Sequence, residues 1–293
     1  MQELIDGHTR LYALLGSPVG HSGSPKMYNY CFSKLGINSA YVALDVTLDR
    51  LPAAMQGVKA MGFAGLNITM PCKRAVMEYL DEISPEAQLM QACNVAVNRD
   101  GHWVGYNTDG VGYVQDLAAH GVDVAGKVIS VLGAGGAGTA IAVQCVLSGA
   151  KELFLFNRRS GASWERAQAL QQRLAQAVPG CVVTVCDLED AACVQEKLAG
   201  SEILANATRV GMAPDMDRMP IPSAEFLHAG MVVTDAIYNP RKTKLLQAAD
   251  AAGCQTLDGT GMLVQQGAAA LKLFAGAEMP VDEVHALVFG AEA

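Results

Sequence analysis

Residues 128–160 read VISVLGAGGAGTAIAVQCVLSGAKELFLFNRRS and carry the clearest structural pattern in the chain. An apolar run at 128–132 leads into GAGGAG at 133–138, a helical stretch follows, and a second apolar run ends at Phe156. The glycine pattern G-x-G-x-x-G is weak evidence alone, but between a strand and a helix it is typical of a dinucleotide-binding βαβ unit. This stretch therefore predicts a Rossmann-type domain.

The small residues of this turn have separate roles. Gly133 allows a tight turn, and Gly138 allows the helix and the strand to pack closely. Gly135 and Gly136 let a pyrophosphate approach the backbone amides at the helix N-terminus. We therefore expect Gly133, Gly135, Gly136 and the adjacent Ala137 to contact the cofactor.

The residues after the second strand bear on which cofactor binds. NAD sites usually have Asp or Glu here, which accepts hydrogen bonds from the ribose 2′-hydroxyl, whereas this chain has Asn157, Arg158 and Arg159. Guanidinium groups bind a 2′-phosphate through charge-assisted hydrogen bonds, so NADP is favoured. Two alternatives remain open. Arg158 could stack on the adenine, which would permit NAD as well, and one arginine, more readily Arg159, could simply be solvated.

Length and charge exclude several classes of protein. The chain has 293 residues, which corresponds to two domains or one large barrel. Apolar residues make up 51% and charged residues 17%, so the chain can bury a large core and does not have a disordered composition. The net charge of −8 disfavours nucleic acid as a partner, because an acidic surface repels phosphate backbones.

Targeting and metal signals are absent from the sequence. No apolar run approaches the roughly 20 residues that cross a bilayer, and we expect no membrane association. The polar stretch at residues 1–10 resembles neither a secretory signal nor a transit peptide, so a cytoplasmic location is expected. Eight cysteines without a Cys-x-x-Cys pair and six scattered histidines predict reduced, mostly buried thiols and no metal site.

Short apolar runs alternate with helical stretches in two series. In the first third of the chain, strands are predicted at residues 11–15, 40–45, 65–69 and 93–98. Later strands are predicted at residues 127–132, 152–156, 182–186, 203–206, 232–236 and 255–257. Helices are predicted at residues 137–147, 164–177 and 242–252. This alternation favours an α/β fold with parallel sheets covered on both faces.

The boundary between the two series falls within residues 108–120. Thr108 or Asp109 can cap a helix there, because their side-chain oxygens accept hydrogen bonds from amides of the first helical turn.

A final helix at 261–275 follows a second glycine-rich turn, DGTG at 258–261, and can return to the first domain. We therefore expect a discontinuous N-terminal α/β domain formed by residues 1–108 and 263–293. A doubly wound, parallel-sheet Rossmann domain is expected at residues 109–262.

Six short motifs are distributed along the chain: GSPVGHSGSP at 16–25, NITMPCK at 67–73, NTDG at 107–110, NAT at 206–208, DAIY at 235–238 and GMLVQQ at 261–266. Together they closely resemble the shikimate dehydrogenase family, in the same order and over nearly the whole chain. The stretches GHTRLYA at 7–13 and HSGSPKMYN at 21–29 are more similar to the branch that oxidises both shikimate and quinate.

The resemblance implies an NADP-linked interconversion of 3-dehydroshikimate and shikimate. It places the substrate in the N-terminal domain, the cofactor in the Rossmann domain and the active site in the cleft between them. Lys73 matches the acid–base residue, since an ammonium group stabilises charge on the carbonyl oxygen and delivers a proton. Asp109 matches its partner. From the residues alone, a solvated Lys73 and a helix-capping Asp109 remain open.

The resemblance also assigns side chains to the substrate carboxylate. Ser22 and Ser24 match two hydroxyl donors, and Tyr238 is the third candidate donor. By itself, Ser-x-Ser-Pro is typical of a helix N-cap with proline in the first turn.

Asn94 and Gln266 match residues that bind the ring hydroxyls, and Thr69 is a further substrate contact. Polar groups that read several hydroxyls explain selectivity, because an analogue that lacks one leaves a buried group unpaired. Cys93 and Val95 beside Asn94 depart from the Val and Thr that the family usually has.

Further cofactor contacts are implied outside the glycine-rich turn. Thr208 and Gly259 line the cofactor, and Ala236 and Met262 lie against the nicotinamide. Arg209, where a small residue is commoner, can reach the cofactor phosphates or point to solvent.

Two alternatives to an NADP-linked shikimate dehydrogenase remain. A quinate/shikimate dehydrogenase uses NAD or NADP in quinate catabolism, and Ser22 and Ser24 are compatible with either substrate. A nucleotide-sensing regulator without chemistry predicts gaps at the catalytic positions, whereas Lys73 and Asp109 are both present. The expected binding partner is the small-molecule substrate. The protein is expected to be a monomer or a homodimer.

Overall fold

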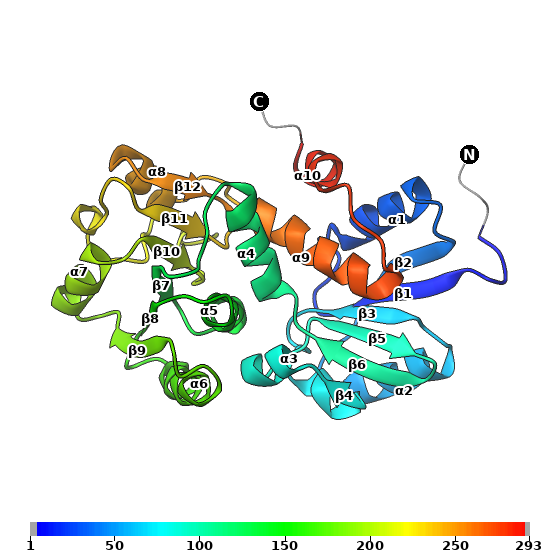
Figure 1. Ribbon diagram of the computed structural model, residues 1–293. Helices are drawn as coiled ribbons and strands as arrows, with labels where there is room; N and C mark the ends of the chain where they lie inside the picture. Colours follow the sequence, from blue (N-terminus) through cyan, green and yellow to red (C-terminus); the bar gives the residue numbers. More distant parts are fainter. Residues whose placement is uncertain (1–4, 291–293) are drawn as a thin grey trace. The chain divides into compact units, whose positions relative to one another are not determined.

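The chain forms two compact units and passes from one to the other twice, after Thr108 and after Leu263 (Figure 1). Unit 1 contains the chain up to Thr108 and again from Val264, and unit 2 is Asp109–Leu263. The structure is a computed structural model that describes residues 5–290. The outermost residues of the expected first domain, 1–4 and 291–293, lie outside the described part.

Unit 2 contains a six-stranded sheet in the order β12-β11-β10-β7-β8-β9, with every neighbouring pair parallel. Its strands are β7 (Val128–Leu132), β8 (Glu152–Asn157), β9 (Val182–Asp187), β10 (Ile203–Asn206), β11 (Val232–Asp235) and β12 (Gln255–Leu257). The strand order reverses between β7 and β10, as in doubly wound sheets that bind a dinucleotide at the carboxyl ends of the strands. Each strand predicted for this unit is found, with its ends within one residue.

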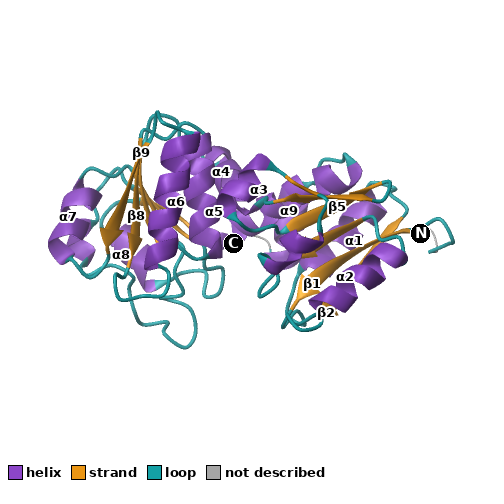
Figure 2. Cartoon of the chain, turned by 90° about the horizontal axis from the view of Figure 1, so that it is seen from below, coloured by secondary structure: helices purple, strands orange, loops and turns teal. Residues whose placement is uncertain are grey.

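Helices cover both faces of this sheet. They are α4 (Asp109–Ala119), α5 (Gly136–Leu147), α6 (Trp164–Ala177), α7 (Ala191–Ala199), α8 (Lys244–Ala251), the start of α9 (Gly259–Ala275) and the short 3₁₀ turn η2 (Ala224–Phe226). Phe154 and Phe156 join a buried cluster with α7 and α8. Strand alternation directs Leu153 and Leu155 to the opposite face, and α5 contacts β7 and β8. Figure 2 shows α6 and α7 on opposite sides of β8.

The predicted helices of unit 2 are present, with α6 at the predicted residues. Helix α9 begins at Gly259, two residues earlier than expected. The Asp258 carboxylate accepts the backbone N–H of Thr260 at 2.9 Å, and this side-chain bond supports the helix start at an earlier residue.

Unit 1 contains a second six-stranded sheet, in the order β2-β1-β3-β5-β6-β4. Its strands are β1 (Arg10–Gly16), β2 (Ser39–Asp45), β3 (Gly65–Ile68), β4 (Glu82–Ile83), β5 (Val95–Arg99) and β6 (His102–Tyr106). Its helical segments are α1 (Ser24–Lys34), α2 (Leu51–Ala60), η1 (Ala75–Tyr79), α3 (Pro85–Met90), the rest of α9 and α10 (Val281–Phe289).

The expectation of parallel sheets is wrong for unit 1. Strand β5 is antiparallel to both β3 and β6, so this sheet is mixed. The antiparallel pairing of β5 and β6 follows from a hairpin at Asp100 and Gly101, which both have positive φ (53° and 93°), as a two-residue hairpin turn requires. The Asp-Gly pair was the sequence signal for β6, a strand absent from the prediction.

The sheet of unit 1 is buried on both faces. On one face, Tyr12 and Val97 pack with residues of α1, α9 and α10, including Phe274. On the other face, Leu15 and Trp103 pack with residues of α2. The α/β fold class, with a discontinuous first unit and a doubly wound second unit, is confirmed.

None of the eight cysteines forms a disulfide in the described residues; six are buried and two partly buried, and the prediction of mostly buried thiols is confirmed. Within residues 5–290, no helix is both long enough and apolar enough to cross a membrane.

Candidate active site

The glycine-rich turn of unit 2 has the geometry that its residues predict. Gly133 ends β7 with φ of +95°, a conformation that side chains rarely adopt. A Cβ at Gly138 would collide with the carbonyl oxygen of Gly133, so only glycine lets α5 start this close to the strand. The turn thus delivers the chain directly from the carboxyl end of β7 into the N-terminus of α5.

The space beside this turn fits a pyrophosphate. Gly135 and Gly136 are exposed, and a Cβ added to either would meet no atom within 4 Å. Ala137, in the first turn of α5, is partly buried. The unbonded amides of a helix N-terminus attract anions, so the open glycines face an anion-binding position. On this ground the residues present fit the dinucleotide that the sequence predicts.

The end of β8 carries the three residues expected to bind the ribose end of the cofactor. Arg158 is exposed, and the Nδ2 atom of Asn157 is buried with no hydrogen-bond partner among the described residues. Arg159 is not merely solvated. Its guanidinium carbon lies 5.3 Å from the centroid of the Trp164 ring, and its Nε lies 3.6 Å from Oδ2 of Asp187. The Asn157 amide is an unused donor at this strand end.

Two loops at the carboxyl ends of β10 and β11 hold Thr208 and Ala236. A Cβ at Gly133 would lie 3.0 Å from the Thr208 methyl, so this loop packs against the glycine-rich turn. Burial raises the pKa of Asp235 to about 6, although hydrogen bonds from Ile237, Thr243 and Asn206 oppose the shift. Ala236 and Thr208 are partly buried, and Arg209 is exposed.

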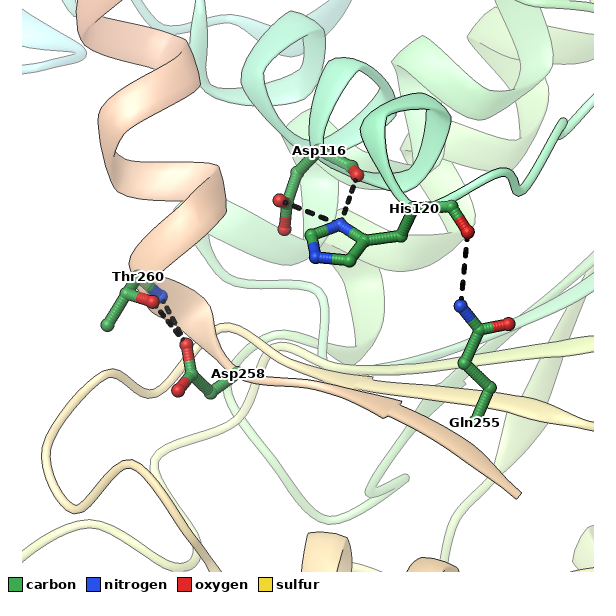
Figure 3. Close-up of polar contacts among 5 residues, drawn as sticks. All are labelled: Asp116, His120, Gln255, Asp258 and Thr260. Carbon is green, nitrogen blue, oxygen red and sulfur yellow. Dashed lines mark hydrogen bonds and ion pairs between the residues drawn. The ribbon is translucent and has the colours of Figure 1, made fainter. Parts of the chain in front are cut away.

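The first turn of α9 carries Gly259 and Met262. A Cβ at Gly259 would collide with the carbonyl oxygen of Ala236, so this turn packs tightly on the loop after β11. Asp258 accepts hydrogen bonds from the backbone and the hydroxyl of Thr260, as Figure 3 shows. Two predicted cofactor residues, Ala236 and Gly259, are therefore in contact within unit 2.

Asp116 of α4 is a buried carboxylate beside the same turn of α9. It accepts the backbone N–H of Met262, and a Cβ at Gly261 would collide with its carboxylate. Burial raises the pKa of Asp116 to about 6, while the nearby His120 lowers it and Asp258 raises it. The Nδ1 atom of His120 lies 3.5 Å from Oδ1 of Asp116 (Figure 3). Sequence reasoning missed Asp116, since an Asp on an apolar helix gives no distinctive signal.

In unit 1 the backbone of Lys73 is bonded to Cys93, the residue before Asn94. Lys73 is partly buried, and its carbonyl oxygen accepts the backbone N–H of Cys93 at 2.8 Å. Asn94 is buried, and its Nδ2 donates to Oγ1 of Thr108 at 3.0 Å and to Oε1 of Gln266 at 3.4 Å. Unit 1 therefore brings together Lys73, Asn94 and Gln266, which lie far apart in the sequence.

Asp109 begins α4 directly after Thr108. The backbone N–H of Thr108 donates to Oδ1 of Asn94 at 2.8 Å, and this bond fixes the chain immediately before Asp109. The structure gives Thr108 a role in orienting Asn94, which the sequence does not indicate.

Thr69 follows β3, and its backbone N–H donates to the carbonyl oxygen of Leu15. Asn67 within that strand is buried and was missed as a functional residue. Its Oδ1 accepts the Tyr41 hydroxyl at 2.8 Å, and its Nδ2 donates to the carbonyl oxygen of Asn94 at 3.4 Å. A polar residue inside the fully buried run GLNI was the signal that could have identified it.

Ser22 and Ser24 lie at the start of α1, after the carboxyl end of β1. The Ser22 hydroxyl oxygen accepts the backbone N–H of Ser24 at 3.2 Å. The residue preceding the helix is Gly23, which forms no side-chain cap, and Pro25 is in the first turn. Both serines are partly buried. Tyr238, the third expected carboxylate donor, belongs to unit 2 and is 39% exposed.

Comparisons with known proteins bear on the whole chain. A shikimate dehydrogenase (NADP(+)) from Streptococcus uberis is 44% identical over 99% of this chain and 98% of its own length. The chain belongs to the shikimate dehydrogenase family. Sequence profiles agree, since the "Shikimate dehydrogenase substrate binding domain" matches residues 14–96 and the "Shikimate 5'-dehydrogenase C-terminal domain" matches residues 259–289.

Other members of the shikimate dehydrogenase family are similarly close. A quinate/shikimate dehydrogenase from Escherichia coli is 44% identical over 96% of this chain and 97% of its own length. The crystal structure of shikimate 5-dehydrogenase from Listeria monocytogenes, in complex with shikimate and NAD, is 40% identical. It covers 99% of both chains with a TM-score of 0.95, so the fold of the two proteins is the same throughout.

One departure from the usual shikimate dehydrogenase sequence has a structural explanation. Cys93 is fully buried, and burial raises the pKa of its thiol to about 12. A Cβ at Gly105 would lie 2.7 Å from its sulfur, so the thiol packs against the neighbouring strand β6. Cys93 is therefore a small apolar residue of the core and not a nucleophile.

Proposed function

We propose that this protein is an NADP-linked oxidoreductase that reversibly reduces 3-dehydroshikimate to shikimate. The observation that carries the proposal is the full-length similarity to a shikimate dehydrogenase (NADP(+)), combined with an intact set of candidate residues. The open glycine-rich turn at the N-terminus of α5 supports dinucleotide binding. The hydrogen bond between Asn94 and Gln266, with the backbone of Lys73 bonded to the neighbouring Cys93, supports substrate binding.

NADP, when bound, supplies the hydride for reduction of the substrate carbonyl or takes it up in the reverse direction. Lys73 stabilises the negative charge on the carbonyl oxygen and donates a proton to it, and in oxidation it receives that proton. Asp109 orients Lys73 and hydrogen-bonds the same substrate hydroxyl. Because the two groups act together, the pH dependence of turnover belongs to the pair.

The remaining polar side chains bind and orient the substrate. Ser22, Ser24 and Tyr238 donate hydrogen bonds to the substrate carboxylate. The hydrogen bond from Asn94 to Gln266 holds both amides in one place, and we assign them, with Thr69, to the ring hydroxyls. These contacts exclude analogues that lack a hydroxyl, since an unpaired buried amide is unfavourable.

The cofactor preference rests on Asn157, Arg158 and Arg159. NADP is preferred because the two arginines attract a 2′-phosphate, and the free Nδ2 donor of Asn157 can serve the ribose or its phosphate. NAD is the alternative cofactor, because stacking of Arg158 on the adenine would not depend on the 2′-phosphate. Gly133, Gly135, Gly136 and Ala137 hold the pyrophosphate, with Thr208, Ala236, Gly259 and Met262 lining the rest of the cofactor.

A second candidate function is a quinate/shikimate dehydrogenase that works in the oxidative direction. It is favoured by the 44% identity to a protein of that name from Escherichia coli. A cytoplasmic location and a monomer or homodimer complete the proposal.

A spectrophotometric assay of shikimate and quinate, each with NADP+ and NAD+, tests the proposal and separates the two candidates. We expect the highest kcat/KM for shikimate with NADP+, whereas a higher value for quinate would favour the second candidate. Lys73→Ala should lower kcat about 10²–10⁴-fold. Lys59→Ala, at an exposed position of α2, is the matched control. Turnover by Lys73→Ala close to that of the wild type would refute the mechanism.

A further inference from the structure

Asp235 and Asn206 end neighbouring strands of unit 2 and are both buried, with exposed fractions of 2% and 0%. They stand side by side in register at the carboxyl ends of β11 and β10, which lead into the loops with Ala236 and Thr208. The reaction mechanism gives neither residue a role. A charged carboxylate and an amide at such burial require partners, because unpaired buried polar groups are strongly unfavourable.

Asp235 receives three donors. Its Oδ1 accepts Nδ2 of Asn206 and the backbone N–H of Ile237, both at 3.0 Å. Its Oδ2 accepts the Thr243 hydroxyl at 2.7 Å. The hydrogen bond from Ile237 closes the turn that contains Ala236. The hydrogen bond from Asn206 connects the carboxylate to the neighbouring strand β10.

Asn206 continues the chain of bonds to the second loop. Its Oδ1 accepts the backbone N–H of Thr208 at 3.0 Å and the Thr208 hydroxyl at 2.8 Å. The Thr208 hydroxyl oxygen in turn accepts the backbone N–H of Val210 at 3.1 Å. The Thr208 hydroxyl is thus used within the protein, and its methyl group faces the glycine-rich turn at Gly133.

We propose that Asp235 and Asn206 are positioning residues for the cofactor site: their hydrogen bonds fix the two loops that carry Thr208 and Ala236 against the glycine-rich turn and the start of α9. This inference rests on the proposed function for the identity of the cofactor. The contact of Gly259 with the carbonyl oxygen of Ala236 joins the same assembly, so one buried pair supports three of the expected cofactor residues.

The test compares variants of the full-length enzyme by initial rates and by NADPH fluorescence titration. Asn206→Ala removes the link from Asp235 to Thr208, and we expect the KM for NADP+ to rise about tenfold or more, because buried donors lose their partner. The KM for shikimate should change less than about twofold. Asp235→Asn keeps an oxygen for Asn206 and Ile237, so its KM for NADP+ should stay within about threefold of the wild type.

Ser201→Ala is the matched control. Ser201 is 1% exposed, precedes β10 at the opposite end of the strand, and its hydroxyl lies 2.7 Å from that of Ser130. Its removal costs a comparable buried hydrogen bond but should leave both KM values unchanged. If Asn206→Ala fails to fold, Asp235→Asn and the NADPH titration still test the positioning role.

Equal rises of both KM values in Asn206→Ala, or the same rise in Ser201→Ala, would show a general structural role and overturn the proposal. A KM for NADP+ in Asp235→Asn as high as in Asn206→Ala would overturn the acceptor role of Asp235. If wild-type enzyme does not oxidise shikimate, the proposed function fails, and the NADPH titration of the same variants still tests the positioning role separately.

Discussion

Asp187 and Arg159 illustrate how single residues adjust the cofactor preference. Asp187 lies opposite Asn157 in the β8–β9 register, and its carboxylate accepts the backbone N–H of Arg159 at 3.2 Å. It also pairs with the guanidinium of Arg159, whose side chain is 72% exposed. Part of the positive charge of Arg159 is therefore balanced within the protein. We expect Arg158 to contribute more of the attraction for a 2′-phosphate.

Arg158→Gln should therefore shift the preference from NADP toward NAD. We expect the ratio of kcat/KM for NADP+ to that for NAD+ to fall about 10-fold or more, because a charge-assisted hydrogen bond to the 2′-phosphate is lost. The measurement is initial rates with both cofactors at saturating shikimate. Equal weakening of both cofactors would instead indicate that Arg158 stacks on the adenine.

A substitution expected to shift the cofactor preference in the opposite direction, toward NADP, provides the matched comparison. Asp187→Asn frees the charge of Arg159 and should raise the same ratio, by no more than about fivefold, since exposed ion pairs contribute little. A fall of the ratio in Asp187→Asn would contradict the balance of charges inferred here.

At the scale of the elements, different glycines of the glycine-rich turn are needed for folding and for cofactor binding. Gly135→Ala should leave the melting temperature unchanged, because its Cβ meets no atom within 4 Å, but should raise the KM for NADP+ by occupying the pyrophosphate space. Gly138→Ala should unfold or strongly destabilise unit 2, because its Cβ collides with Gly133. Thermal unfolding and initial rates check both, and a stable Gly138→Ala would disprove the packing role.

The contact of α4 with α9 should make stability depend on pH. The pKa of Asp116 is about 6 in the folded chain and 3.8 in an ordinary setting, so the fold disfavours its ionised form. At pH values well below 3.8 the group is protonated in both states and contributes no penalty. As pH rises from about 4 to about 6, the free energy of unfolding falls by up to about 3 kcal/mol, at 1.36 kcal/mol per pKa unit.

Asp116→Asn removes this penalty and keeps an acceptor for the Met262 amide. It should be more stable than the wild type by up to about 3 kcal/mol at pH 7, and the difference should vanish at pH values well below 3.8. Urea unfolding at a series of pH values provides the measurement. Asp217→Asn, at a side chain that is 99% exposed, is the control and should show no such trend. A constant difference at all pH values would contradict the assignment.

The elements that could be predicted from sequence are those with one local cause. Strands β7–β12 follow from apolar runs bounded by turns, and the start of α5 follows from the glycine pattern. The hairpin at Asp100 and Gly101 could also have been predicted, since it has a local signal. Asp116 could not be assigned, because its contact depends on Met262, a partner 146 positions away. Asn67 had a local signal as a polar residue in a buried strand, but its partner Asn94, 27 positions away, could not be predicted.

At the scale of the whole molecule, the two chain crossings make the C-terminal segment part of the first unit. Its residues supply a large share of one buried cluster of unit 1: Val264, Ala270, Leu271, Phe274, Met279 and Val284. Unit 2 takes its sheet entirely from residues between the crossings. Because of this discontinuity, we expect unit 1 to need the segment from Val264 to complete its core, whereas unit 2 does not need it.

Truncation after Leu263 should therefore unfold unit 1 and leave unit 2 folded. The two tryptophans separate the signals, because Trp103 is 1% exposed in unit 1 and Trp164 begins α6 in unit 2. In a Trp164→Phe background, the emission of Trp103 should shift to the red on truncation, because its buried apolar surroundings are lost. NADPH binding to unit 2 should persist, and removal of residues 291–293 alone is the control. Unchanged Trp103 emission in the truncated chain would show that residues 5–108 fold without the C-terminal helices and would contradict the division of the core described here.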